Sequence, residues 1–336
     1  MLAYEIQNDG GIDALRTAER PSPEPGPEQI KVRLAASSIN YRDLNTVRYP
    51  GRLGLQFPRI PNSDGAGEVM EVGALVKSFA VGDRVAGCFF QDWEAGGVSP
   101  AVMASALGGP IDGVLAEEVV LNQRGAVRVP DHLSDAEAAT LPCAALTAWH
   151  ALVVKGGLKA GDTVLLLGTG GVSLFALQFA ALHGARVIVT SKSDDKLARA
   201  RDMGAWATVN YVTHPDWESE VVRLTGGLGV DHVVEVGGGG TLEKSIEATR
   251  VGGHIALIGV LTMGSINPMP LLRKSIRLNG IYVGSKAMFE DMNAAMDVAG
   301  LRPVIDRTFP FAAAPDAFRH MEAAGHFGKI VIEFDG

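Results

Sequence analysis

The sequence lacks a cysteine framework, an excess of positive charge and any long apolar run. Only Cys88 and Cys143 are cysteines, so a disulfide scaffold is excluded, and no C-x-x-C pair suggests a structural zinc site. The formal net charge of −8 argues against a nucleic-acid partner. No apolar stretch reaches the roughly 18 residues that span a bilayer, and no signal peptide opens the chain. We therefore expect no membrane association and a reducing, cytoplasmic compartment.

The composition that remains is that of a globular protein. Apolar residues make up 47% and charged residues 20% of the 336 positions, which is typical of a packed domain rather than a disordered or fibrous chain. This length is sufficient for about two domains.

The pattern of residues changes near position 130. Up to there, short β-like runs such as "QIKVRLAAS", "GAGEVMEVG", "DRVAGCFF" and "GVLAEEVVL" are separated by Gly and Pro turns, which predicts a mostly β domain. Ser134, followed three residues later by Glu137, forms a capping-box pattern that predicts the start of a helix. Beyond it, buried strands at 163–168, 186–191, 230–237 and 254–259 alternate with helices at 171–183, 194–203 and 241–249. This alternation predicts an α/β fold with a parallel sheet covered on both faces.

The most informative motif is a glycine turn between a buried strand and a helix. It comprises Gly168, Thr169, Gly170, Gly171, Val172 and Ser173, with Ser173 where a third glycine is usual. In such a turn the backbone approaches a pyrophosphate, and the helix N-terminus supplies free N–H groups. A glycine-rich turn without a ligand is the alternative, but the strand–helix–strand context favours a dinucleotide site.

The end of the next strand predicts which dinucleotide binds. An NAD site usually has an acidic residue there, whereas this chain has Ser191, Lys192 and, further on, Lys196. A hydroxyl and two ammonium groups suit a 2′-phosphate, so NADP(H) is favoured over NAD(H). A solvated helix start is the alternative explanation of the two lysines, and Asp194 and Asp195 between them weaken the case a little.

Together, "AGDTVLLLGTGGVSLFALQFA", "LPCAALTAWHAL" and "SDGAGEV" resemble the medium-chain dehydrogenase/reductase superfamily, in its zinc-independent, quinone-oxidoreductase-like branch (zinc-type alcohol dehydrogenase-like). The resemblance extends from "PGPEQIKVRLAASSINYRDL" to "GHFGKIVIEF". It implies a GroES-like β-barrel catalytic domain over 1–130, completed by 290–336, and a doubly wound Rossmann NADP-binding domain over 131–289. It also implies a cofactor bound in the cleft between the two domains.

The resemblance predicts that no zinc is bound. In zinc-containing relatives the ligand positions correspond here to Asn40, to the stretch 62–64 and to Cys143. Of these positions only Asp64 and Cys143 can ligate zinc, which is fewer than the three protein ligands that a catalytic zinc needs. The region that holds a structural zinc in those relatives, 89–113 here, contains no cysteine.

Without a metal, hydrogen-bond donors have to stabilise the charge that a hydride transfer creates on a carbonyl oxygen. The Asn40 amide, the Tyr41 hydroxyl and Ser63 are the candidates. The resemblance places Asn40 beside the nicotinamide ribose and lets Asp43 brace its loop. Tyr41 is either a proton donor or a pocket wall, and Asp64 is expected to have a structural role first.

The resemblance implies further cofactor contacts. Thr147 is expected near the nicotinamide, Lys329 is expected to reach the cofactor, and Ser285 and Lys286 are placed in the last strand of the nucleotide domain. Backbone along the cofactor channel is expected at Gly237, Gly259 and Val260. An ordinary core or surface role is the alternative for each of these residues. Phe89, Phe90 and Trp93 are either walls of the substrate pocket or core.

Three functions remain open. The leading one is an NADPH-dependent reductase of a quinone or an α,β-unsaturated carbonyl, because a conjugated acceptor spreads the negative charge. The others are an alcohol dehydrogenase acting on alcohols or aldehydes, and a non-catalytic NADPH-binding sensor. The resemblance also implies a homodimer that pairs the edge strands at 276–284, which would bury an apolar edge that otherwise promotes aggregation; a tetramer is the alternative.

Overall fold

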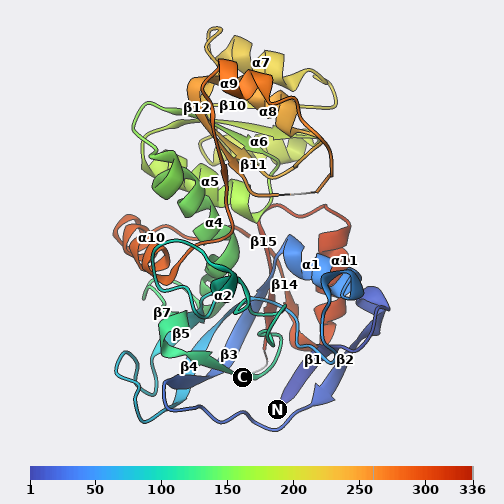
Figure 1. Ribbon diagram of the computed structural model, residues 1–336, viewed down its shortest axis with the longest axis vertical. Coiled ribbons are helices and arrows are strands. Elements are labelled where there is room, and N and C mark those ends of the chain that lie inside the picture. The colour runs from blue at the N-terminus through green and yellow to red at the C-terminus, as the bar shows by residue number, and fades with distance from the viewer. Residues whose placement is uncertain (260, 335–336) are drawn as a thin grey trace. The chain divides into compact units, whose positions relative to one another are not determined.

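The computed structural model describes residues 1–259 and 261–334. Its internal contacts divide the chain into two compact units, Met1–Leu146 with Val283–Gly336, and Thr147–Tyr282. The first unit therefore joins both ends of the chain, which Figure 1 shows in blue and red. The domain limits near 130 and 289 that the sequence suggests stay a prediction.

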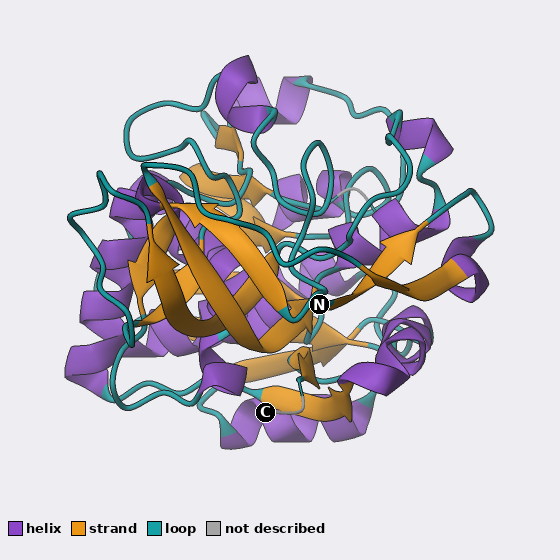
Figure 2. Ribbon diagram, turned by 90° about the horizontal axis from the view of Figure 1, so that it is seen from below, coloured by secondary structure: helices purple, strands orange, loops and turns teal. Residues whose placement is uncertain are grey.

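The first unit has a curved, mainly antiparallel sheet in the GroES-like arrangement. Its strand order is β14-β15-β3-β4-β5-β7, with β6 paired to β3. The strands are β3 (Gln29–Ile39), β4 (Asp64–Val72), β5 (Arg84–Gly87), β6 (Glu118–Asn122), β7 (Ala126–Arg128), β14 (Ile305–Pro310) and β15 (Lys329–Glu333). Figure 2 shows these strands curving around one another. The four predicted β-like runs are confirmed as β3, β4, β5 and β6, whereas β14 and the hairpin of β1 (Leu2–Ile6) and β2 (Leu15–Glu19) were not predicted.

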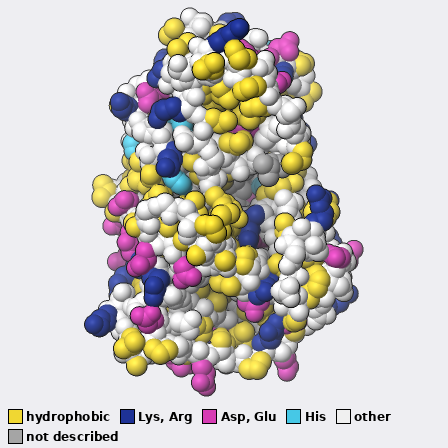
Figure 3. Space-filling model, viewed as in Figure 1, with side chains coloured by type: hydrophobic (Ala, Val, Ile, Leu, Met, Phe, Trp, Pro, Cys, Tyr) yellow, Lys and Arg dark blue, Asp and Glu magenta, His cyan; other side chains and the backbone are white. Residues whose placement is uncertain are grey.

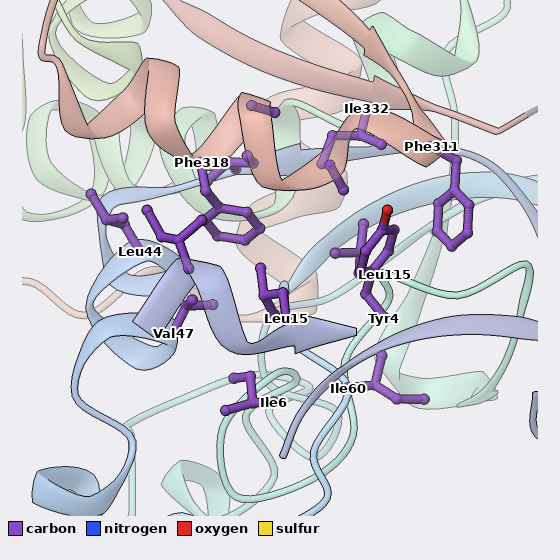
Figure 4. Packing of buried hydrophobic residues seen from close by; sticks show 14 of the residues in the cluster. Tyr4, Ile6, Leu15, Leu44, Val47, Ile60, Leu115, Phe311, Phe318 and Ile332 are labelled. Carbon is purple, nitrogen blue, oxygen red and sulfur yellow. The ribbon is translucent and has the colours of Figure 1, made fainter. Parts of the chain in front are cut away.

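An apolar cluster holds the helix that follows β3. Leu44 and Val47 of α1 (Tyr41–Arg48) are buried against Phe318 of α11 (Ala314–Glu322), as Figure 4 shows. Ile39, the last residue of β3, and Ile330 of β15 belong to the same cluster. Burying such side chains contributes about 1.5–3 kcal/mol each, so the junction between β3 and α1 is firmly fixed. The polar residues at this junction are thereby fixed in position.

The second unit has a six-stranded, fully parallel sheet in Rossmann-like order, β10-β9-β8-β11-β12-β13. Its strands are β8 (Thr163–Leu167), β9 (Arg186–Ser191), β10 (Ala207–Asn210), β11 (Val230–Glu235), β12 (Thr249–Leu257) and β13 (Arg277–Gly280). Its helices are α5 (Gly171–Leu182), α6 (Asp194–Asp202), α7 (Trp217–Leu224), α8 (Leu242–Ala248) and α9 (Met269–Arg273). All five residues of β8 are buried, as a central parallel strand requires. The predicted α/β alternation is confirmed.

Two local predictions have different outcomes. The capping box is confirmed, because Ser134 accepts from the N–H of Glu137 at 3.2 Å and Glu137 accepts from the N–H of Ser134 at 2.8 Å. The placement of Ser285 and Lys286 in a strand is wrong. Strand β13 ends at Gly280, and Ser285 caps α10 (Lys286–Ala299) in the first unit. Within the described residues, no helix combines the length and the apolar character that a membrane span needs.

Candidate functional site

The glycine turn of the second unit has the backbone of an anion site. Gly168 adopts a φ of 74°, which a residue with a Cβ rarely adopts. Gly170 precedes α5 and no side chain caps that helix, so the first N–H groups of α5 have no side-chain acceptor. Ser173 donates to the carbonyl of Leu167 at 2.8 Å and holds the helix against the strand. A small polar residue thus replaces the third glycine. Thr169, Gly171 and Val172 complete the turn.

The end of β9 presents hydroxyl and ammonium groups. Ser191 is buried and its oxygen accepts from the N–H of Ser193 at 3.2 Å. Lys192 is exposed and Lys196 is half-buried in the first turn of α6. Asp194, whose charge weakened the NADP prediction, accepts from the side chain of Asn210 at 2.7 Å. One of the two acidic groups therefore has a hydrogen-bond partner on the neighbouring strand β10.

The sequence analysis missed Glu235, a fully buried carboxylate at the end of β11. One oxygen accepts from the backbone N–H groups of Gly237 and Gly238 at 2.7 and 3.0 Å and from the Thr241 hydroxyl at 2.6 Å. The other accepts from the Ser245 hydroxyl. This carboxylate shapes the glycine-rich loop after β11. A strand that ends in Glu before a run of four glycines was the available signal.

Steric constraints of the fold already explain two of the predicted channel glycines. A Cβ at Gly259 would lie 1.8 Å from the carbonyl oxygen of Val236, and one at Gly237 would lie 2.3 Å from the Thr241 hydroxyl. Only glycine fits such close approaches. Val260, predicted beside them, lies outside the described residues.

The remaining predicted cofactor contacts are distributed over both units. Thr147 is buried on α4 (Leu146–Trp149), where the second unit begins. The Ser285 hydroxyl accepts from the N–H of Met288 at 3.3 Å and so serves as a helix cap. Lys286 donates to the carbonyl of Gln123 at 3.1 Å, within the first unit. Ser285 and Lys286 thus have structural partners, and their contact with a cofactor stays a prediction.

The first unit gathers polar groups at the junction of β3 and α1. We call them the Asn40 cluster, consisting of Asn40, Asp43, Asp64, Cys143 and Lys329. Asp43 is fully buried and accepts from the backbone N–H of Asn40 at 2.8 Å, which fixes the start of α1. Burial raises the pKa of the Asp43 carboxyl and the nearby Asp64 charge adds to this, while Arg42 opposes the rise. Asp43 therefore ties the backbone of Asn40 to the first turn of α1.

Asp64 is the hub of this cluster. It is fully buried and accepts from the Ser63 hydroxyl at 2.6 Å and from the backbone N–H of Cys143 at 3.0 Å. The ammonium of Lys329 lies 3.9 Å from its second oxygen. Because Ser63 gives its only hydroxyl hydrogen to Asp64, Asn40 is the better placed donor for a ligand.

Asn40 carries an unused donor. Its side-chain oxygen accepts from Lys329 at 2.6 Å, whereas its Nδ2 atom is buried and has no hydrogen-bond partner. Buried polar groups are nearly always paired, so an orphaned amide indicates a missing acceptor. This atom is the strongest evidence for a ligand in the first unit.

The donor set does not fit zinc. Both oxygens of Asp64 are engaged, and an ammonium lies beside Asp64 and the Asn40 oxygen where a second cation would be repelled. Burial strongly raises the pKa of the Cys143 thiol, which opposes the thiolate that zinc requires. In the part of the chain that the structure describes, no group of three or more His, Cys, Asp or Glu side chains is arranged to hold a metal.

The residues beside the cluster differ in exposure. Tyr41 is 46% exposed at the start of α1, so its hydroxyl is accessible to solvent. Phe89, Phe90 and Trp93 are buried and pack edge to face, with centroid distances of 4.7 and 5.8 Å between successive rings. The guanidinium of Arg42 stacks 4.7 Å from the Phe89 ring, which connects α1 to this aromatic group. The three rings therefore belong to the hydrophobic core, and a role as walls of a substrate pocket stays a prediction.

Two family models match the chain in sequence order. Residues 26–131 match the alcohol dehydrogenase GroES-like domain and residues 171–299 match the zinc-binding dehydrogenase model. A zinc-type alcohol dehydrogenase-like protein of Schizosaccharomyces pombe is 40% identical over 99% of both chains. A solved structure from Sinorhizobium meliloti 1021 is 45% identical, with a TM-score of 0.92 over 98% of each chain.

Other solved structures have names that bear on cofactor and substrate. A structure described as an NAD-dependent alcohol dehydrogenase is 36% identical, with a TM-score of 0.90 and 99% of both chains covered. A quinone oxidoreductase of Coxiella burnetii and a mycobacterial protein bound to NADPH are each 27% identical over 99% of both chains. Their TM-scores are 0.82 and 0.83.

Proposed function

Because the chain belongs to the medium-chain dehydrogenase/reductase superfamily, as a zinc-type alcohol dehydrogenase-like oxidoreductase, we propose that it reduces a quinone or an α,β-unsaturated carbonyl with NADPH and without zinc. The observation that carries this proposal is the buried Asn40 amide, whose Nδ2 atom has no partner in a cluster that does not fit a metal. The Coxiella burnetii quinone oxidoreductase, similar over nearly its whole length, supports the acceptor class.

The chemistry of the acceptor follows from what the chain can stabilise. NADPH, when bound, supplies the hydride. Hydride addition to the β carbon of an enone leaves negative charge shared between the oxygen and the α carbon. An amide N–H from Asn40 stabilises that shared charge more easily than it would stabilise a localised alkoxide, for which zinc relatives use a Lewis acid. A proton from solvent or from the exposed Tyr41 hydroxyl then completes the reduction at the α carbon.

The preference for NADPH rests on the end of β9. Ser191, Lys192 and Lys196 offer donors to a 2′-phosphate, and Asp194 is bonded to Asn210. The uncapped start of α5 suits the pyrophosphate. The similar mycobacterial structure with bound NADPH supports this choice.

An alcohol dehydrogenase is the second candidate. The 36% identical NAD-dependent alcohol dehydrogenase favours it, as does the name of the Schizosaccharomyces pombe relative. For this alternative the chain would have to reduce simple aldehydes at least as well as enones.

The test is turnover by chelator-treated protein with NADPH and, separately, NADH. The acceptors are a panel of enones, quinones and simple aldehydes matched in chain length. We expect NADPH oxidation with the conjugated acceptors only, at a rate that chelation does not change. Activity confined to aldehydes, or lost on chelation, would replace the proposal with the alcohol dehydrogenase. Tight NADPH binding without turnover of any acceptor would indicate a sensor.

We also propose that the second unit forms a homodimer through β13. This strand is at the edge of the six-stranded sheet, and Leu261, Met263, Leu272 and Tyr282, which precede or follow it in the sequence, are 51%, 89%, 72% and 45% exposed. Figure 3 shows hydrophobic side chains gathered on the part of this unit where Figure 1 places α9 and β12. An unpaired strand edge beside exposed apolar side chains is a template for pairing with a second copy.

A further inference from the structure

Lys329 is buried at the first position of β15, with 3% of its surface exposed. Its ammonium donates to the side-chain oxygen of Asn40 at 2.6 Å and to the carbonyl of Ile39 at 3.1 Å. The carboxylate of Asp64 lies 3.9 Å away and supplies the countercharge. A lysine ammonium has three N–H donors, and these acceptors surround it. Lys329 is therefore bound into the protein rather than directed toward a ligand.

This contact determines which way the Asn40 amide faces. An ammonium has only donors, so the amide atom next to it has to be the oxygen. The NH2 group then faces the opposite way, where Nδ2 is buried without a partner. If the amide were reversed, two donors would oppose each other at 2.6 Å. Lys329 thus fixes the amide in the orientation that leaves its N–H groups for an incoming oxygen.

We propose that Lys329 is a positioning residue, which acts on the reaction by orienting the Asn40 amide toward an oxygen atom of the bound substrate or cofactor. This inference rests on the proposed function. It replaces a direct contact between Lys329 and the cofactor with an indirect effect through Asn40. An oriented donor is already in place when charge develops on the substrate oxygen, so the protein need not reorganise.

The test has to separate orientation from charge balance, because removal of the ammonium leaves Asp64 buried without a countercharge. Two charge-balanced variants achieve this, Lys329→Met with Asp64→Asn, and Lys329→Gln with Asp64→Asn. The two differ in one respect, since only the glutamine can donate an N–H to the Asn40 oxygen. Asn40→Ser removes the amide but keeps a residue that caps helices well. Each variant is measured for kcat, KM of acceptor and NADPH affinity, alone and combined with Asn40→Ser.

We expect Asn40→Ser to lower kcat/KM by about a hundredfold, the usual effect of losing one oxyanion donor. The methionine variant should show a similar loss, and adding Asn40→Ser to it should cause no further loss. The glutamine variant should recover at least part of the activity. Losses in kcat with unchanged NADPH affinity would identify a substrate oxygen as the acceptor, whereas weaker NADPH binding would identify a cofactor hydroxyl.

Equal activity of the methionine and glutamine variants, or losses that multiply with Asn40→Ser, would overturn the proposal. A measurement on the unmodified protein covers the case in which the neutral variants do not fold. The side-chain amide signal of Asn40, assigned by its absence from the Asn40→Ser spectrum, is followed by nitrogen-15 NMR while NADPH and then an unreactive enone analogue are added. We expect both N–H signals to be resolved and one to shift downfield. An Asn40 signal that neither addition moves would contradict the inference.

Discussion

The carboxylate of Asp64 accepts a hydrogen bond from the backbone N–H of Cys143 at 3.0 Å, across 79 positions of the chain. Asp64 and Cys143 are the two residues at the zinc-ligand positions that could still bind zinc. The bond engages an oxygen of Asp64 with the backbone N–H of Cys143. Together with the Ser63 hydroxyl and the Lys329 ammonium, it surrounds Asp64 with donors from the protein itself. Lys329 thus supplies the countercharge of Asp64 without a metal, and Arg42, 3.2 Å from Asp43, supplies that of Asp43.

This arrangement predicts that the purified protein holds zinc far below one ion per chain. The physical reason is that a divalent ion would have to displace a buried ammonium and ionise a thiol whose pKa is raised. Elemental analysis after dialysis against a chelator, with a zinc-containing alcohol dehydrogenase treated in parallel, measures the content. About one zinc per chain, with activity that depends on it, would contradict the prediction.

Lys192→Ala should weaken NADPH binding about tenfold, which corresponds to about 1.4 kcal/mol, and should leave NADH binding unchanged. The loss comes from one charge-assisted contact with the 2′-phosphate, which NADH does not have. Lys159→Ala is the matched control, since Lys159 is exposed on the same unit and only its backbone has a described partner, Asp162. Fluorescence titration with each nucleotide measures the affinities. Equal weakening for NADPH and NADH would mean that Lys192 does not contact the phosphate.

Glu235→Gln should lower the free energy of unfolding by about 2–4 kcal/mol, because a buried NH2 group would then face donors. Four hydrogen bonds converge on this carboxylate, from Gly237, Gly238, Thr241 and Ser245. The control is Glu247→Gln, an exposed position of α8 whose change should cost less than about 1 kcal/mol. Urea unfolding monitored by circular dichroism gives both values. Equal stability of the two variants would show that the loop after β11 does not depend on the carboxylate.

The second unit should lose stability as the pH falls from about 6.5 toward 4. His254 is fully buried, and its ring lies 5.7 Å from that of His232. Burial lowers the pKa of His254 from its ordinary 6.5 to about 4, and the charges of His232 and Arg277 add to the effect. Its neutral form stabilises the fold fully above pH 6.5. Below that pH the unfolded chain binds a proton that the folded chain does not bind until about pH 4.

Between pH 7.5 and 5.0 the wild type should therefore lose about 2 kcal/mol more than His254→Gln does. Urea unfolding at a series of pH values measures the difference. His214→Gln, at an exposed position, should follow the wild type. If the free energies of unfolding of wild type and His254→Gln depend on pH in the same way, the pKa of His254 does not differ between the folded and unfolded states.

Leu272→Asp should convert the proposed dimer into a monomer. Leu272 is 72% exposed on α9, the helix that precedes the edge strand β13 in the chain, and a carboxylate there would have to be desolvated in the proposed interface. Val298→Asp is the control, since Val298 is 92% exposed on α10 of the first unit. Sedimentation velocity measures the mass of each. A wild type that sediments as a monomer, or a Leu272→Asp dimer, would contradict the proposal.

The sequence predicted those parts of the fold whose signals are local. An example is the stretch from β8 through the turn at Gly168 to the start of α5. Its apolar run, glycines and helix start lie within a few residues of one another, so the local sequence predicts all three. Strand β14 was missed because its burial does not alternate clearly: three of its six residues are exposed, three are partly exposed and none is buried. The extent of β13 was overestimated because its apolar run continues beyond Gly280 into non-strand backbone.

The chemistry of the site was only partly predictable. Asn40 and Lys329 were both singled out, but the bond between them joins residues 289 positions apart, and no local pattern indicates such a pairing. The Asn40 Nδ2 atom has no partner because that bond turns it away from Lys329, so it could be recognised only from the three-dimensional structure. Glu235 was overlooked because two of its four donors are backbone N–H groups, which composition does not display, and the other two are the hydroxyls of Thr241 and Ser245 further along the chain.

The most direct test of the central claim is where the hydride goes. The protein is supplied with NADPH that carries deuterium on both C4 positions, together with an enone, and the product is examined by NMR. We expect a saturated carbonyl compound with deuterium on the former β carbon, because the proposed reaction leaves a conjugated charge rather than an alkoxide. Deuterium on the carbonyl carbon of an allylic alcohol would mean that the chain acts as an alcohol dehydrogenase, and it would contradict the account.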